Sequence, residues 1–252
     1  MAEGLNIIHH LVDSAPWAKV EVAGYSLPIT KHVVMLWISA GLVFALFTWI
    51  GRQRSLVPTG ARNFFEMILL YLRDEVVYAN LGAKYGERYL PYLWTLFFFI
   101  LFSNLLGMVP FGATATGNLA VTAALALVTF GITHVSGMAH YGPLGYLKRA
   151  FLVGPPYMWP LMVFLEAIGH LVKPFALTVR LFANMLSGHI LLLVFFGFLL
   201  AASGIVGAVV TGVTVFGILV FSLMELMVAV LQAFVFVLLS TVFINMALHA
   251  DH

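Results

Sequence analysis

Stretches of about twenty residues with almost no charge recur along this chain, and they restrict it to a membrane fold. Of its 252 residues, 62% are hydrophobic and only 9% are charged, whereas soluble domains carry about 25% charged residues. A transmembrane helix needs about 20 mostly apolar residues, and several windows of the chain satisfy that requirement. The sequence therefore predicts an all-α, polytopic membrane protein.

Five apolar segments are long enough to span a bilayer, and an amphipathic segment follows the first. This amphipathic segment, about residues 62–81, carries Arg62, Glu66 and Arg73 on one helical face, which is typical of an interfacial or re-entrant helix. A helix of about 40 residues is about 60 Å long, twice the hydrocarbon thickness, so the last two spans are expected to tilt or kink. The predicted spans are residues 32–50, 91–109, 119–137, 158–200 and 207–248, within one membrane domain, 32–252.

Basic residues indicate which loops face the cytoplasm. Arg52 and Arg54 follow the first span, and Lys148 and Arg149 follow the third. The positive-inside rule places both loops in the cytoplasm, so the N-terminus is expected outside and the C-terminus inside. Residues 1–31 do not resemble a signal peptide and are expected to form an external segment, either an interfacial helix or an extended peptide.

Arg180 is the only cation between Lys173 and the C-terminus, and it lies within an apolar stretch. An arginine near the bilayer centre is disfavoured by about 3 kcal/mol on insertion scales, so it usually faces a wet cavity or an anionic partner. The run after Arg180 contains a single acid deep within it, Glu225. These two residues are the first candidates for a functional site.

A polar stripe runs along the expected penultimate helix. Steps of four and three residues place its members on one face of the helix, while the rest of that surface is apolar. His189 lies off this stripe, at a depth where Glu225 on the antiparallel last helix can meet it. The stripe comprises Glu166, His170, Lys173, Leu177, Arg180, Asn184 and Ser187.

The last helix carries a shorter stripe of Ser222, Glu225, Ala229 and Gln232. Glu225 and His189 can gain and lose protons when their surroundings shift them, and Gln232 can order water. Arg180 stays protonated, so it cannot relay protons but can repel a passing cation or favour an ionised carboxylate. A titratable path interrupted by a permanent cation indicates ion translocation with a built-in barrier.

Other interpretations remain open for these residues. Glu225 and Arg180 are also consistent with a structural ion pair in a packing subunit. A self-contained transporter using Arg180 as an anion site is a further alternative, although no internal repeat supports it.

The sequence lacks the residues or motifs that several classes of chemistry require. The chain contains no cysteine, which excludes disulfides and thiolate sites. Its nine histidines are not paired at matched depth, as a membrane haem would require. No Walker A, HExxH or Gly-x-Ser-x-Gly motif is present, so the chain is expected to be no enzyme by itself, with no cofactor, metal, nucleotide or nucleic acid.

Two motifs resemble subunit a of the F-type ATP synthases. Lys173-Pro174, residues 177–184 and Gly188 are similar to the family's arginine-helix signature, and residues 231–236 are similar to its last-helix signature. The resemblance extends from about His32 through the C-terminus. It implies a proton-translocating stator subunit for ATP synthesis beside a rotating c-ring, held by peripheral stalk b subunits in a bacterial inner or mitochondrial inner membrane.

The resemblance also implies residue roles. Arg180 would face each passing c-ring carboxylate and separate two aqueous half-channels. Asn184, His189, Glu225 and Gln232 would line the outer half-channel, and Glu166 would lie near the cytoplasmic one. Further possible members of the path are His170, Lys173, Ser222 and Asn104.

The residues at positions 189 and 225, and that at position 107, differ among members of the family. Relative to some members, the acid and the histidine at positions 189 and 225 are exchanged, an arrangement similar to mitochondrial and alphaproteobacterial forms. Gly107 stands where some bacterial relatives have an aspartate, which argues against a side-chain role for that position in the proton path.

Overall fold

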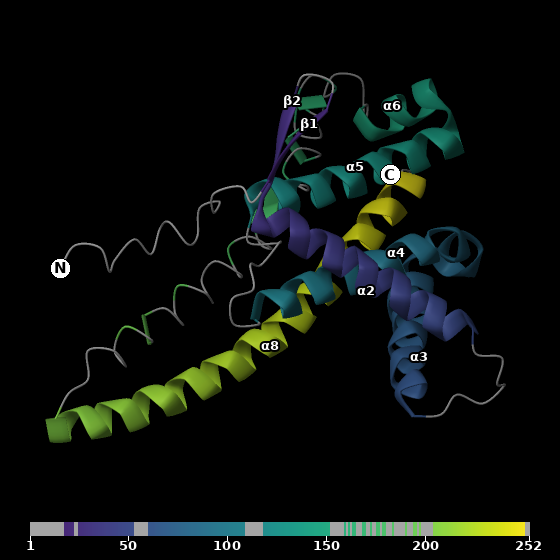
Figure 1. The fold of residues 1–252 in the computed structure, drawn as a ribbon. Helices are drawn as coiled ribbons and strands as arrows, with labels where there is room; N and C mark the ends of the chain where they lie inside the picture. The colour runs from purple at the N-terminus through teal and green to yellow at the C-terminus, as the bar shows by residue number, and fades with distance from the viewer. Residues whose placement is uncertain are drawn as a thin grey trace.

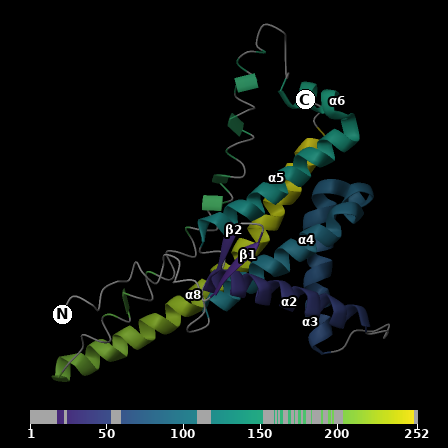
Figure 2. The same cartoon turned by 45° about the horizontal axis from the view of Figure 1, so that its top comes forward.

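A computed structural model gives the fold (Figures 1 and 2). The structure describes residues 18–22, 25–52, 60–108, 118–151 and 204–249, together with individual residues between 159 and 197. Apart from one short hairpin near the N-terminus, the elements in these ranges are helical. The prediction of an all-α polytopic membrane protein is confirmed.

The hairpin precedes the first long helix. Strands β1 (Ala18–Val22) and β2 (Tyr25–Ile29) pair antiparallel, with Val20 opposite Leu27. Helix α2 (Lys31–Arg52) begins directly afterwards. Of the two conformations left open for the N-terminal segment, residues 18–22 and 25–29 therefore adopt the extended one, and residues 1–17, 23 and 24 lie outside the described part.

The amphipathic segment forms a helical hairpin with the next helix. Helix α3 (Ala61–Tyr71) continues into the π-helix η1 (Leu72–Tyr78) and then α4 (Ala79–Met108). Gly82 interrupts α4 with φ +69°, a conformation that favours glycine because it has no Cβ. The chain turns back there, and the indole Nε1 of Trp94 donates a hydrogen bond of 3.1 Å to the Leu69 carbonyl.

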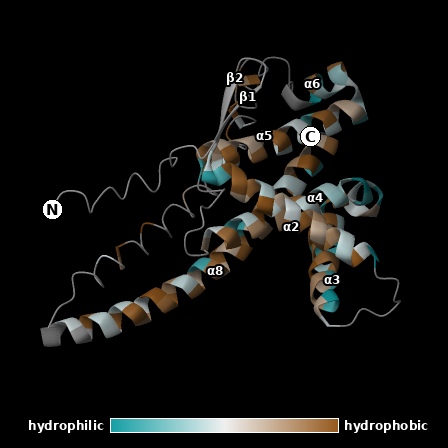
Figure 3. Cartoon of the chain, in the orientation of Figure 1, coloured by the Kyte–Doolittle hydropathy of each residue, from teal (hydrophilic) through white to brown (hydrophobic). Residues whose placement is uncertain are grey.

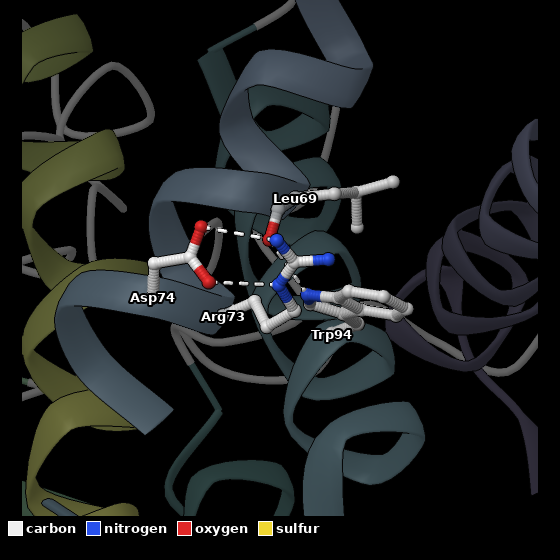
Figure 4. Close-up of polar contacts among 4 residues, drawn as sticks. All are labelled: Leu69, Arg73, Asp74 and Trp94. Atoms are coloured by element: carbon white, nitrogen blue, oxygen red, sulfur yellow. Dashed lines mark hydrogen bonds and ion pairs between the residues drawn. The ribbon is translucent and has the colours of Figure 1, made fainter. Parts of the chain in front are cut away.

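Charged residues of η1 lie on its exposed side. Arg73 forms two hydrogen bonds, of 2.8 and 3.1 Å, with the carboxylate of Asp74 (Figure 4). The opposite side of the same turn buries Leu72, Val76 and Val77. This turn therefore has one charged side and one apolar side.

Helix α5 (Leu119–Tyr141) and the short helix α6 (Pro143–Phe151) form a second unit. The side chain of Asn118 caps α5 by accepting a 2.9 Å hydrogen bond from the Ala120 amide. Gly142 turns the chain between the two helices with φ +75°. The ring of Tyr146 then lies over Gly137, where an added Cβ would clash with it.

Helix α8 (Gly204–Leu248) has 45 residues and is about 67 Å long at 1.5 Å per residue. Its C-terminal half packs against α4 and α5, and its N-terminal half extends away from them (Figures 1 and 2). The main core joins α2, α3, η1 and α4 to this C-terminal half. The C-terminal half of α8 therefore belongs to the core, and the N-terminal half lies outside it.

Four long segments within the described ranges are apolar enough to cross a membrane. Apolar residues run along their surfaces, whereas the turn at the start of α4 is hydrophilic (Figure 3). The segments make this a multi-pass membrane protein. They are Lys31–Arg52, Ala61–Met108, Leu119–Tyr141 and Val210–Leu248.

Candidate functional site

A buried polar face on α8 is the centre of the candidate site. Glu225 and Gln232 are seven residues apart, so they lie on one side of the helix, two turns from each other. Their exposed fractions are 7% and 4%, and Ala229 between them is fully buried. A carboxyl group and an amide therefore face the interior of the bundle from the same helix.

Asn104 of α4 meets this face from the opposite helix. Its side chain is fully buried, and its Nδ2 donates a 3.2 Å hydrogen bond to the Ala229 carbonyl. That carbonyl lies one turn beyond Glu225, so the bond fixes the height of α4 against the polar stretch of α8. Asn104 thereby joins Glu225 and Gln232 in one cluster, named the polar cluster below.

Neither carboxylate oxygen of Glu225 has a hydrogen-bond partner among the described residues, although both are buried. A buried carboxyl group without a partner is costly, and such groups usually bind water, a proton or another polar group. Ser222 lies about one turn earlier and is half-buried. The contacts of α4 and α8 therefore leave the carboxylate of Glu225 without a hydrogen-bond donor among the described residues.

The candidate residues between positions 166 and 189 lie outside the described part of the chain. Thr178, close to them in sequence, is helical and 7% exposed. It is a buried polar side chain that the sequence analysis did not select, because it lies one position off the stripe. The predicted residues that fall outside the described part are Glu166, His170, Lys173, Arg180, Asn184 and His189.

Further along α8, two buried hydroxyl groups were also missed by the sequence analysis. Ser240 donates to the Phe236 carbonyl at 2.7 Å, and Thr241 donates to the Val237 carbonyl at 2.8 Å. Their spacing from Gln232 gave no signal, because eight and nine residues rotate by about 80° and 180° around a helix and so do not return to the face of Gln232. Because both hydroxyls are satisfied by their own helix, they contribute packing rather than an open polar site.

The C-terminal end of α8 is held by aromatic and basic side chains. The hydroxyl of Tyr141 donates a 2.7 Å hydrogen bond to the Leu248 carbonyl, one of the last carbonyls that a helix leaves without an internal donor. The Arg149 guanidinium lies 4.2 Å from the centre of the Tyr141 ring. These contacts fix the end of the helix that carries the polar cluster.

Known proteins with a similar sequence were found across almost the whole chain. The model of the family described as ATP synthase A chain matches residues 33–245. ATP synthase subunit a of Myxococcus xanthus is 51% identical over 230 residues, covering 90% of this chain and 75% of the relative. The subunit a of Chloroherpeton thalassium is 41% identical over 266 residues, covering 99% of this chain and 79% of the relative.

These relatives correct one expectation. The likeness to mitochondrial and alphaproteobacterial forms is wrong, because the relatives are myxobacterial and from the Chlorobi. The expectation depended on one exchanged pair of residues, and two positions carry far less information about lineage than the whole chain. The extent of the match is decisive for the family itself: the chain belongs to the ATP synthase A chain family and is a membrane subunit of ATP synthase, not an enzyme by itself.

Proposed function

We propose that this subunit carries protons through two aqueous half-channels separated by Arg180 and passes them to and from carboxylates of a c-ring, so that ion flow drives rotation. The observation that carries the proposal is the polar cluster, with the buried carboxylate of Glu225 at its edge, which has no hydrogen-bond partner among the described residues. Such groups are rare inside apolar helices and mark ion paths by default. The chain also belongs to the ATP synthase A chain family, which supports an ion-transport role for this cluster.

In this proposal the charged groups have separate roles. Glu225 and His189 take up protons in the outer half-channel, and Asn184 and Gln232 order water beside them. Glu166 lies at the cytoplasmic half-channel, with His170 and Lys173 as flanking polar groups, and Ser222 flanks Glu225 on α8. Asn104 holds α4 against the path through its bond to the Ala229 carbonyl.

Arg180 acts because it cannot lose its proton. Its fixed charge favours the ionised form of a neighbouring carboxylate, so a protonated ring site releases its proton before it passes the arginine. The same charge repels protons that would otherwise leak directly between the half-channels. A transfer of one charge through 100 mV yields about 2.3 kcal/mol, so several transfers must accumulate before ATP can form.

The proposed setting follows from the same assignment. Residues 32–252 form one membrane domain in a bacterial inner membrane, with residues 1–31 outside and the C-terminus in the cytoplasm. The partners are the c-ring, the b subunits of the peripheral stalk and the surrounding lipid. The chain itself binds no nucleotide and needs no cofactor in this proposal.

The test of the gate is Arg180→Ala in the complete ATP synthase, reconstituted in vesicles. We expect the complex to assemble and ATP-driven proton pumping to be abolished. Arg73→Ala is the matched control, because Arg73 is exposed and paired with Asp74, and it should pump normally. Coupled pumping by Arg180→Ala would overturn the gate assignment, and ion flux through the subunit without a ring would favour a self-contained transporter.

A second experiment tests the pairing of His189 with Glu225. Each single change, His189→Glu or Glu225→His, should slow proton entry, and combining both changes should restore part of the rate. The exchange keeps one acid and one imidazole in the path while reversing their positions. A double variant no faster than the slower single variant would exclude direct pairing.

A further inference from the structure

A groove between α4 and α5 lies apart from the polar cluster. The two helices both pack on α8, while long side chains bridge the space between them. The hydroxyls of Tyr92 and Thr129 share a 2.8 Å hydrogen bond, and the Tyr85 and His140 rings lie 5.6 Å apart. Between these bridges the helices leave a cavity of about 390 Å³.

The lining of this groove is mostly apolar, and its polar members are Arg88, Tyr89 and Ser136. Along α5 it presents Val128, Ile132 and Val135, with Gly131 providing open space in the wall. From Val128 to Ala139 the lining extends about 16 Å along the helix, at 1.5 Å per residue. A long, narrow apolar surface of this kind suits a hydrocarbon chain.

Arg88 is the one charged residue among the described lining residues. It is exposed, and its sequence neighbour Glu87 is also exposed but does not line the groove. The structure shows no ion pair or hydrogen bond between Arg88 and the other described residues. The guanidinium is therefore free to bind an anion at the groove.

The position of Arg88 along the bundle matches that of a lipid headgroup. It follows the turn at Gly82 by about six residues, near the ends of α5 and α8, where the Tyr85 ring meets both His140 and His249. Lys148 and Arg149 of α6 follow the same end of α5. Basic pockets between transmembrane helices at such an end are typical binding sites for anionic headgroups.

The volume of the groove, about 390 Å³, limits which molecule can occupy it. A helix about 10–12 Å in diameter takes up about 400–600 Å³ per turn, so the groove is too small for a partner helix. One flexible acyl chain fits, and a guanidinium binds phosphate through two parallel hydrogen bonds. We propose that this groove binds an anionic phospholipid, with its phosphate on Arg88 and one acyl chain along α5.

The experiment uses the complete ATP synthase in phosphatidylcholine bilayers containing a small fraction of phosphatidylglycerol with a photoreactive acyl chain. After irradiation, mass spectrometry maps the labelled peptides. We expect labelling between Val128 and Ala139 in the unmodified complex and about fivefold less in Arg88→Gln, as the loss of one basic contact implies. Lys84→Gln removes an exposed cation one turn away that does not line the groove, and it should label normally.

A second variant tests the acyl-chain part independently. Gly131→Leu fills the groove, because an added Cβ meets nothing within 4 Å, and it should abolish labelling while Arg88 stays in place. Equal labelling by a photoreactive phosphatidylcholine would overturn the proposal, as would unchanged labelling in Arg88→Gln. The amount of subunit retained in each purified complex shows that the variants assemble.

Discussion

Helix α8 has two halves with different surfaces. From Val210 to Met224, large apolar side chains point outward, and Val213, Phe216 and Leu219 are each 68% exposed. From Glu225 to Leu248, one face is buried against α4 and α5, with Phe236 and Val237 almost fully covered. The composition is similarly apolar on both sides of this boundary.

The difference shows that hydrophobicity along a membrane helix does not tell which part packs inside the protein. In lipid an exposed valine or phenylalanine costs nothing, so packing is driven by close contact and by polar groups that need partners. Of the buried polar residues of α8, Glu225, Gln232, Ser240 and Thr241 lie in the packed half, and only Thr214 lies in the other half among the described residues. Four predictions test whether residues of the packed half contribute more to proton transport and to the free energy of unfolding than residues of the exposed half.

The largest effect is expected at the boundary itself. Glu225→Leu removes the buried carboxylate and should slow proton transport through the reconstituted complex by about a hundredfold, as expected for the loss of a positioned proton-transfer group. Met224→Leu changes the adjacent residue, which is 48% exposed, and should leave the rate unchanged. Equal rates for the two variants would show that the polar cluster is structural.

A pair of phenylalanine substitutions compares the halves directly. Phe236→Ala should lower the free energy of unfolding by about 3 kcal/mol, because it opens a cavity in close-packed surroundings. Phe216→Ala should change it little, since that ring is 68% exposed and lipid can fill the space. SDS titration of the subunit in mild detergent, followed by circular dichroism, measures both, and similar losses would refute the distinction.

A smaller effect is expected where α4 meets the packed half. Asn104→Leu removes the bond to the Ala229 carbonyl and should cost about 1 kcal/mol in the same titration. Thr95→Val on α4 is the control, because the Thr95 hydroxyl is exposed and bonds only to the Pro91 carbonyl of its own helix among the described contacts. A larger loss in Thr95→Val than in Asn104→Leu would contradict the role given to Asn104.

The smallest effect concerns pH at the end of the packed half. Burial raises the pKa of Tyr146, which lies in α6 outside the spanning helices and packs near Ala247. The folded state therefore holds the phenolic proton more tightly, so this contribution to stability is intact below pH about 10 and is lost as pH rises further. Tyr146→Phe should remove that part of the alkaline decline, and an identical decline in both proteins would exclude it.

Much of the helical architecture was predictable, because a membrane-spanning helix needs about 20 consecutive apolar residues and such runs are visible in the sequence. Helices α2 and α5 coincide closely with uncharged runs. Helix α4 begins at Ala79 rather than near Pro91, which lies inside it. The sharp turn is instead at Gly82, where a single glycine gave too weak a local signal.

The candidate site was predictable only in its parts. Spacing placed Glu225 and Gln232 on one face of a helix, and the structure confirms that both are buried. The bond from Asn104 to Ala229 joins residues 125 positions apart, and one of the groups is a backbone carbonyl that no sequence pattern marks. The roles of Arg180, Asn184 and His189 remain predictions, because these residues lie outside the described part.

The long-range bond of Asn104 also has a consequence for biosynthesis. The amide is made 125 residues before the carbonyl that it binds. At about 5–20 residues per second, this delay lasts about 6–25 s. For most of that interval α4 is complete while synthesis has not yet reached α8, which begins at Gly204. Closure of the bundle at Asn104 must therefore wait until Ala229 has been synthesised and has left the ribosome.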